Sequence, residues 1–257
     1  DTHLGKYVNS PESPIFQKGK LIYHLNDAKL AIRRHNRVLL FEGFLDVISA
    51  VEAGFVESVA TMGTALTEDH SRELRRLTDQ IILCFDGDKA GLAAANKAIP
   101  ILMAQNFSVS VVEIPNKMDP DEFIKTHGKE AFSKLIDQAI PAVDYQYRYI
   151  KRQFNLEFVS HREQFKRQIY HFAYTLQSHT LQELILKKLA YDISIGEQSI
   201  LQEFNSSKSQ VYKNANINNN KNENLQIHSR QVRDTKYERS EKMLIHYMLK
   251  ERRVALQ

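Results

Sequence analysis

Two stretches of sequence decide the fold: QIILCFDGD at residues 80–88 and VLLFEG at residues 38–43. Each holds a short apolar run that is typical of a buried strand, followed at once by acidic residues. Glu42 follows the earlier run, and Asp86 and Asp88 follow the later one. Ligands bind at the carboxyl ends of the strands in open α/β sheets. Acids that meet there repel each other unless a cation neutralises them, so the pattern indicates a divalent metal of the Mg²⁺ type and phosphoryl chemistry.

The region from 38 to 114 alternates between strand-like and helix-like patterns. Thr67 is a candidate N-cap for one of the helices. Strands separated by helices of this length imply βαβ units, so we expect an α/β fold with a mainly parallel sheet flanked by helices. We expect strands at 38–41, 56–61, 80–85 and 108–114, and helices at 21–36, 46–53, 66–77 and 89–103.

Residues 129–204 carry only helical patterns, which predict an all-helical subdomain that follows the sheet. Tyr145, Tyr147 and Tyr149 fall in this segment, and we expect them to pack rather than to stack on bases. Apolar stripes at helical spacing are formed by Phe165, Ile169, Phe172 and Leu176, and by Leu181, Leu184, Ile185 and Leu189.

A polar tract follows at residues 205–229, with seven asparagines between 214 and 224. It offers too little apolar surface to fold, so we interpret it as part of a linker. After it, Met243, Leu244, Tyr247 and Met248 mark one amphipathic helix. Because a single helix cannot bury its own apolar stripe, we expect it to open a further domain or to dock on a partner.

The composition bounds the setting of the protein. The net charge is +4 over 257 residues, and residues 1–37 hold seven basic and three acidic residues, a possible phosphate-facing patch. Cys84 is the only cysteine, so an intrachain disulfide is excluded, and no Cys/His set has zinc-ligand spacing, which fits a reducing cytoplasm. The sequence has no run of about 20 apolar residues, so we expect no membrane span. We also expect no signal peptide at the start of this sequence. The chain begins at Asp1 in polar sequence, and we interpret it as part of something longer.

The acids have a geometric reason to converge. Asp86 and Asp88 are two residues apart, so an extended backbone points them to the same side. Asp46 lies four residues after Glu42, and all four acids meet if the two strands are neighbours in the sheet. Asp119 and Asp121 add an acidic pair after the fourth strand, although Asp119 before a proline is also typical of a helix N-cap. A turn followed by a cap equally explains residues 86–88.

Several motifs together resemble those of a known family. LFEGFLD at 40–46, MGTA at 62–65 and FDGDKAG at 85–91 resemble the Toprim domain, which topoisomerases, primases and some nucleases share. The flanks are similar to bacterial DNA primases of the DnaG type over nearly the whole chain. KYVNSPES at 6–13 and FQKG at 16–19 resemble the basic segment before Toprim, KMDPDEF at 117–123 the later acidic motif, and EKMLIHYM at 241–248 the start of the helicase-binding domain.

The resemblance implies an RNA polymerase core that makes short RNA primers from NTPs on single-stranded DNA at the replication fork of a bacterial cytoplasm. It implies Mg²⁺, with Mn²⁺ as the other option, and no zinc here because the family's zinc-binding domain is absent. The replicative helicase would be a partner, and the core would be monomeric. By motif position, Glu42, Asp86 and Asp88 would be catalytic metal ligands, Asp46, Asp119 and Asp121 would complete the metal cluster, and Lys6, Asn9, Lys18 and Lys89 would face nucleotide or DNA.

The resemblance also divides the chain. Residues 1–36 would end the basic N-terminal subdomain, 37–128 would be the Toprim catalytic domain, and 129–204 the helical subdomain. Residues 205–235 would be a flexible linker, and 236–257 the first helix of a truncated helicase-binding domain.

Two other functions stay open from the residues. The same metal cluster would serve a Toprim enzyme that cleaves DNA strands, a nuclease or a topoisomerase, although no tyrosine stands out as a nucleophile. A non-catalytic module that docks a partner through residues 236–257 is the other. For the polymerase, we prefer Glu42 as a metal ligand over Glu42 as a general base. We interpret His70 as a packing or surface histidine, because no second metal ligand accompanies it.

Overall fold

The computed structural model describes residue 13 and residues 17–207. The chain divides into two compact units, residues 1–169 and residues 170–257. Lys6, Asn9, the tract from 208 to 235 and the expected helix at 236–257 lie outside the described residues. Where the linker was expected to begin, residues 205–207 still belong to a helical segment that starts at 197.

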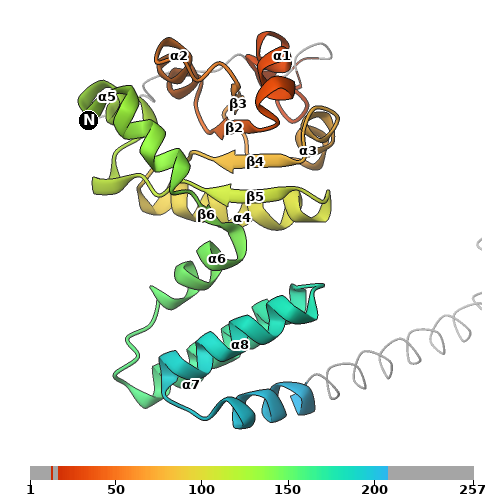
Figure 1. The fold of residues 1–257 in the computed structure, drawn as a ribbon, viewed down its shortest axis with the longest axis vertical. Helices are drawn as coiled ribbons and strands as arrows, with labels where there is room; N and C mark the ends of the chain where they lie inside the picture. Colours follow the sequence, from red (N-terminus) through yellow and green to blue (C-terminus); the bar gives the residue numbers. More distant parts are fainter. Residues whose placement is uncertain (1–12, 14–16, 208–257) are drawn as a thin grey trace, which may run out of the picture. The chain divides into compact units, whose positions relative to one another are not determined.

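Within the described residues, six strands form one sheet in the order β1-β3-β2-β4-β5-β6 (Figure 1). The central four run parallel: β3 (Ser58–Thr61), β2 (Val38–Phe41), β4 (Gln80–Leu83) and β5 (Ser108–Val111). At the edges, β1 (Ile22–Tyr23) pairs antiparallel with β3, and β6 (Ile140–Pro141) pairs antiparallel with β5. The predicted α/β fold with a mainly parallel sheet is confirmed.

Helices cover both faces of this sheet. Alternate strand residues point to opposite faces, so Leu40 joins one core and Leu39 the other. The first core also takes side chains from α1 (Leu25–His35), α3 (Glu68–Arg75), α4 (Lys89–Ala104) and α6 (Ala142–Lys151). The second takes side chains from α2 (Phe44–Glu52) and α5 (Pro120–Asp137). A sheet buried on both sides explains why β2, near its middle, is a continuous apolar run with all four residues buried.

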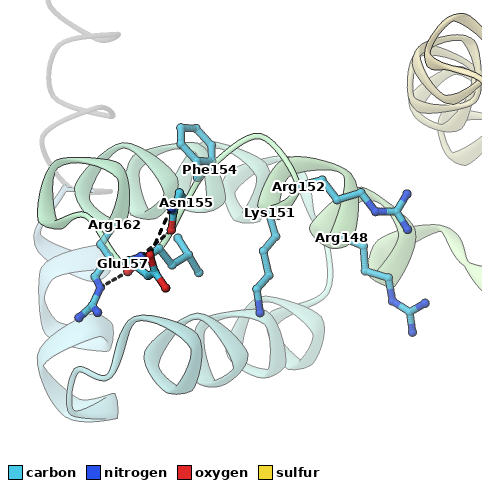
Figure 2. Close-up of a pocket in the computed structure, with 8 residues that line it drawn as sticks. Arg148, Lys151, Arg152, Phe154, Asn155, Glu157 and Arg162 are labelled. Atoms are coloured by element: carbon cyan, nitrogen blue, oxygen red, sulfur yellow. Dashed lines mark hydrogen bonds between the residues drawn. The ribbon is translucent and has the colours of Figure 1, made fainter.

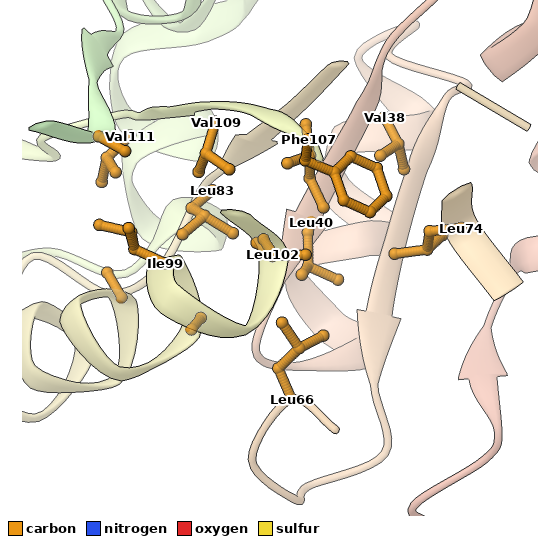
Figure 3. Close-up of a cluster of buried hydrophobic side chains, with 14 of the residues drawn as sticks. Val38, Leu40, Leu66, Leu74, Leu83, Ile99, Leu102, Phe107, Val109 and Val111 are labelled. Atoms are coloured by element: carbon orange, nitrogen blue, oxygen red, sulfur yellow. The ribbon is translucent and has the colours of Figure 1, made fainter. Parts of the chain in front are cut away.

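Helix α4 packs most directly over the middle of the sheet (Figure 3). Its Ile99 and Leu102 meet Leu40 of β2, Leu83 of β4 and Val109 of β5, and all five side chains are almost fully buried. Full burial of such a side chain contributes about 1.5–3 kcal/mol. This packing fixes where the first turn of α4 lies against the carboxyl ends of β2 and β4.

The predicted elements are close to the observed ones, with two omissions. β2 has the predicted bounds, α4 ends one residue later than expected, and Thr67 caps α3 through its side chain. The edge strands β1 and β6 were missed, because a two-residue strand leaves no periodicity in the sequence. β1 was included in an expected helix; His24 adopts a left-handed conformation (φ 62°), so that α1 starts only at Leu25.

Helix α5 runs across residue 128, where Gly128 (φ 82°) marks a kink, and the sheet gains its last strand β6 after it. In the first unit, Tyr145 and Tyr147 of α6 are fully buried, which confirms that they pack. Tyr147 meets Phe165 of α7 (Val159–Thr175) edge to face. None of the helices among the described residues is long and apolar enough to cross a membrane.

The second unit holds the end of α7, helix α8 (His179–Ile193) and the helical segment 197–207. Tyr174 stacks on Phe204 and its hydroxyl donates to the Phe204 carbonyl. The predicted stripe on α8 is partly wrong. Ile185 and Leu189 are buried as expected, but Leu181 and Leu184 are exposed, because the buried face is shifted toward Gln182 and Leu186.

Candidate active site

Glu42 and Asp46, after β2, and Asp86, after β4, lie around one cavity at the carboxyl edge of the sheet, whereas Asp88 is exposed and is not part of its lining. β2 and β4 are parallel neighbours with Leu40 opposite Leu83, and Cys84 N donates to Leu40 O at 2.8 Å. Glu42 and Asp86 therefore follow adjacent strand ends, which is the condition for convergence. Both line a cavity of about 670 Å³, which Asp46 also reaches.

The carboxylate of Glu42 is only partly satisfied by the described residues. Its Oε1 atom is buried and has no hydrogen-bond partner among them. Burial raises the pKa of its carboxyl to about 7, and the negative charge of Asp86 adds to the rise. A carboxylate with these two features is strongly biased toward binding either a proton or a cation.

Asp46 is held differently. It lies in the first turn of α2, where its Oδ2 accepts from Gly43 N and its Oδ1 accepts from Asp121 N, both at 3.2 Å. Burial, followed by the charge of Asp86, raises its pKa to about 7 despite these two donors. The side chain of Asp46 thus connects the N-terminus of α2 to the N-terminus of α5 beside the cavity.

Asp86, Gly87 and Asp88 form a tight turn between β4 and α4. Burial raises the pKa of Asp86, as do the charges of Asp119 and Asp88. Asp88 is exposed and caps α4, its Oδ1 accepting from Gly91 N at 2.8 Å. A Cβ atom on Gly87 would lie 2.4 Å from Ile114 O, and one on Gly91 would lie 2.2 Å from Asp86 O. The backbone is so close at both positions that only glycine fits.

The later acidic pair is bound to the N-terminus of α5. Asp119 is the N-cap, and its Oδ1 accepts from Glu122 N at 2.6 Å, with Pro120 in the first turn. Asp121 accepts from the Ser49 hydroxyl and pairs with Lys125 at 2.8 Å. The capping interpretation of Asp119 is therefore confirmed, and its charge still reaches the cavity, since it raises the pKa of Asp86.

The basic segment at residues 6–19, here called the basic leader, is described at its end, where Lys18 and Gly19 are anchored on the start of α3. His70 is fully buried, its Nδ1 accepts from Thr67 N, and its Nε2 lies 2.9 Å from Lys18 O. Thr67 Oγ1 donates to Gly19 O at 2.6 Å. Burial lowers the pKa of His70, so the ring is a neutral packing group, as expected. These bonds fix the backbone at Lys18, while Lys89 is exposed in the first turn of α4.

Two cavity residues were missed as candidates. Thr64 has a buried Oγ1 atom without a hydrogen-bond partner among the described residues, and Lys97 of α4 lines the same cavity. Thr64 lies inside the MGTA motif at 62–65, and that motif is the sequence signal that marks it. Lys97 is eight residues after Lys89, so helical periodicity alone would have put it on a related face of α4.

The carboxylates around the cavity are the residue type that binds a cation, but among the described residues they are not close enough together to form a complete set of ligands. Among residues 13 and 17–207, no three His, Cys, Asp or Glu side chains are grouped closely enough to hold a metal as they lie. Glu42 has a buried, unpartnered oxygen, and burial together with neighbouring carboxylates raises the pKa values of Glu42, Asp46 and Asp86. A hard divalent cation that takes oxygen ligands fits this donor set.

The fold and the site together define a Toprim-like α/β domain: the profile of the Toprim-like family matches residues 39–124. The DNA primase of Geobacillus stearothermophilus is 35% identical over 251 residues, 98% of this chain and 42% of the relative. That of Listeria monocytogenes is 37% identical over 79% of this chain and 33% of the relative. The structure of a DnaG primase catalytic domain bound to ssDNA superposes with a TM-score of 0.65 at 30% identity, over 77% of this chain and 63% of that one.

The chain belongs to the bacterial DNA primases of the DnaG type, and it spans less than half of the length of these curated relatives.

Proposed function

We propose that this chain carries the catalytic Toprim part of a DNA primase, which makes short RNA primers from NTPs on a single-stranded DNA template at the replication fork. The observation that carries the proposal is the buried, unpartnered Oε1 of Glu42 beside Asp86, at adjacent ends of parallel strands. Relatives that are primases support synthesis rather than the strand cleavage considered above.

The cation would be Mg²⁺, with Mn²⁺ as a substitute, and Glu42, Asp86 and Asp88 would be its direct ligands. Asp46, Asp119 and Asp121 would complete the acidic cluster. Like Asp88, each of them also accepts a hydrogen bond from another residue of the chain. When bound, such metals activate the attacking hydroxyl and neutralise the leaving pyrophosphate.

The chain's own residues would supply position and charge. The tight turn at Gly87 holds Asp86 at the cavity and is followed by the exposed Asp88 and Lys89, and Lys89 would meet a phosphate. The leader around Lys18, fixed by Thr67 and His70, would lie along template or incoming nucleotide, together with Lys6 and Asn9. The replicative helicase would bind through the segment at 236–257, and the bacterial cytoplasm would be the site of action.

The test is metal-dependent dinucleotide synthesis by an Asp86→Asn variant. The substitution keeps the shape of the side chain and removes its charge, so synthesis should fall by more than about a hundredfold. Asp79→Asn is the matched control, because Asp79 is an exposed aspartate at the opposite end of the same strand. Wild-type synthesis by Asp86→Asn would refute the assignment, and plasmid nicking with Mg²⁺ and no NTPs would favour a cleaving enzyme instead.

A further inference from the structure

A basic pocket lies apart from the carboxylates, where helix α6 leads into α7. It has a volume of about 890 Å³ and is open to solvent (Figure 2). Its lining holds four cationic side chains, Arg148, Lys151, Arg152 and Arg162, and one acidic side chain, Glu157. The polymerase chemistry proposed above makes no use of this pocket.

Two of the arginines form a pair that is held in place by one carboxylate. Arg148 and Arg152 are one helical turn apart on α6, so they project from the same face (Figure 2). Arg152 Nη2 donates to Glu113 Oε1 at 2.6 Å, and Arg148 Nη1 lies 3.8 Å from Glu113 Oε2. A single carboxylate cannot neutralise two guanidinium groups, each with five N–H donors. Since both side chains are about half exposed, the pair is pre-positioned and still able to bind an anion.

This pair lies at the same edge of the sheet as the candidate active site. β4 and β5 are parallel neighbours with Leu83 opposite Val111, so Glu113 follows β5 much as Asp86 follows β4. Neighbouring strands are about 4.8 Å apart, which puts Glu113 one strand beyond the carboxylates. The Tyr145 hydroxyl donates to Leu92 O and joins α6 to α4, whose first residues flank the acidic turn.

An exposed aromatic side chain lies next to the pocket. Phe158 is 58% exposed and directly follows the pocket residue Glu157. By contrast, Phe154 packs against Phe165 and serves the core of this region. Cations that track a backbone beside an aromatic ring that accepts a base are the combination found in proteins that bind single-stranded nucleic acid.

We propose that the Glu113-bridged arginine pair and the basic pocket beside it bind the phosphodiester backbone of a nucleic-acid strand that leaves the carboxylate edge of the sheet. Phe158 stacks on a base of this strand. The proposal rests on the proposed function for the identity of the ligand, which is the single-stranded template. A duplex presents the same phosphates, so the experiment includes both forms.

The test measures the affinity of the chain for a fluorescent oligothymidylate by anisotropy over a series of salt concentrations. Arg148→Gln/Arg152→Gln should weaken binding about tenfold, and each lost phosphate contact should lower the slope of log affinity against log salt by about 0.7. Arg148→Lys/Arg152→Lys keeps both charges and should keep the wild-type slope. Phe158→Ala should weaken binding and leave the slope unchanged, because stacking releases no counterions.

Arg72→Gln/Arg76→Gln is the matched control, because these exposed arginines, in α3 and at its C-cap, are also ion-paired and carry the same charge. An equal loss in both double variants would show a general charge effect and overturn the proposal. Unchanged affinity and slope in Arg148→Gln/Arg152→Gln, with a native circular dichroism spectrum, would overturn it too. Competition by polyglutamate as strong as by oligonucleotide would identify an acidic protein as the ligand, again against the proposal. A duplex that competes better than a single strand of equal length would assign the same backbone site to the primer–template duplex.

Failure of the site and failure of the proposed function are separable. Asp86→Asn should lose synthesis and bind the oligonucleotide like the wild type. If Asp86→Asn still synthesises while the arginine variant loses binding, the proposed function fails and the backbone site stands. If synthesis depends on Asp86 while the arginine variant binds normally, the site fails and the function stands.

Discussion

Glu42 is half-buried and Glu57 is buried, and they lie at opposite ends of two neighbouring parallel strands. The two carboxylates differ in whether the chain itself pairs them. Glu57, just before β3, accepts from Arg37 Nε at 3.0 Å and lies 3.1 Å from His35 Nδ1. Glu42, just after β2, keeps a buried oxygen without a partner among the described residues. At the amino edge, the buried carboxylate is therefore paired within the chain, whereas at the carboxyl edge one carboxylate oxygen has no partner among the described residues. Local rules of stability are broken where a protein binds or reacts, and kept elsewhere.

The substitution Glu42→Gln tests this difference between Glu42 and Glu57 most directly. We expect synthesis to fall by more than about a hundredfold, because the amide is a poor ligand for a divalent cation. The metal-free fold should be as stable as the wild type or more so, because the neutral amide is not repelled by Asp86. Dinucleotide synthesis and thermal melting in EDTA measure the two effects. A large drop in melting temperature would mean that Glu42 is a structural group like Glu57.

The next largest effect is expected on stability, from a substitution in the turn that holds Asp86 and Asp88. Gly87→Ala would force a Cβ atom to 2.4 Å from Ile114 O, and we expect a loss of about 2–4 kcal/mol in the free energy of unfolding. Gly196→Ala is the control, since its Cβ would lie 3.9 Å from Ser199 Oγ. Urea denaturation of both variants measures the difference, and equal stability would show that the turn has room to move.

Glu57→Gln tests the ion-paired carboxylate at the amino edge of the sheet. Loss of the carboxylate leaves Arg37 and His35 without their shared partner, but both are partly exposed, so we expect about 1–3 kcal/mol of destabilisation. Synthesis per folded molecule should stay at the wild-type level, measured at a temperature where both proteins are folded. A catalytic defect in the folded variant would contradict the division between the two edges.

The pH dependence of stability sharpens the comparison further. The pKa of Glu42 is raised from 4.5 to about 7 in the folded state, so the folded protein binds this proton more tightly than the unfolded one. Without a cation, this group should therefore stabilise the fold below about pH 4.5 and lose that contribution as the pH rises to about 7. After allowance for solvent exposure, we expect about 1–2 kcal/mol.

Urea denaturation in EDTA at several pH values measures this effect. His70 acts in the opposite direction, because its lowered pKa costs stability when the ring is protonated at acid pH. The difference between the wild type and Glu42→Gln isolates the carboxyl group. A difference that does not change between pH 4.5 and pH 7 would mean that Glu42 is not perturbed.

The smallest expected effect concerns the anchor of the basic leader. Thr67→Val removes the side-chain cap of α3 and the bond to Gly19 O, at a cost of about 1 kcal/mol. We expect KM for NTPs or template to rise more than kcat falls, because the anchor fixes Lys18 and not the carboxylates. Thr78→Val is a control, since Thr78 is a buried threonine near the amino end of β4. A fall in kcat alone would refute an anchoring role.

Much of the sheet could be predicted from local sequence. β2 is a run of four apolar residues between turn signals, and Thr67 and Asp119 have the residue types that cap helices. The edge strands could not be predicted, because β1 and β6 exist only through pairing with β3 and β5. The same holds for α8, whose buried face depends on which neighbours pack against it.

The sequence by itself determined which residues are acidic and that they follow strands, because strand pattern and charge are local properties. Only the tertiary structure decided which of those acids are committed to the chain itself. It joins both oxygens of Asp46 to backbone amides and makes Asp119 a helix cap, while it leaves Glu42 with a buried oxygen that no described residue pairs. The pairing of β6 with β5 also places α6 beside the end of β5, so that Arg148 and Arg152 meet Glu113, 35 residues or more away in the chain; such a contact depends on tertiary packing and leaves no local pattern in the sequence.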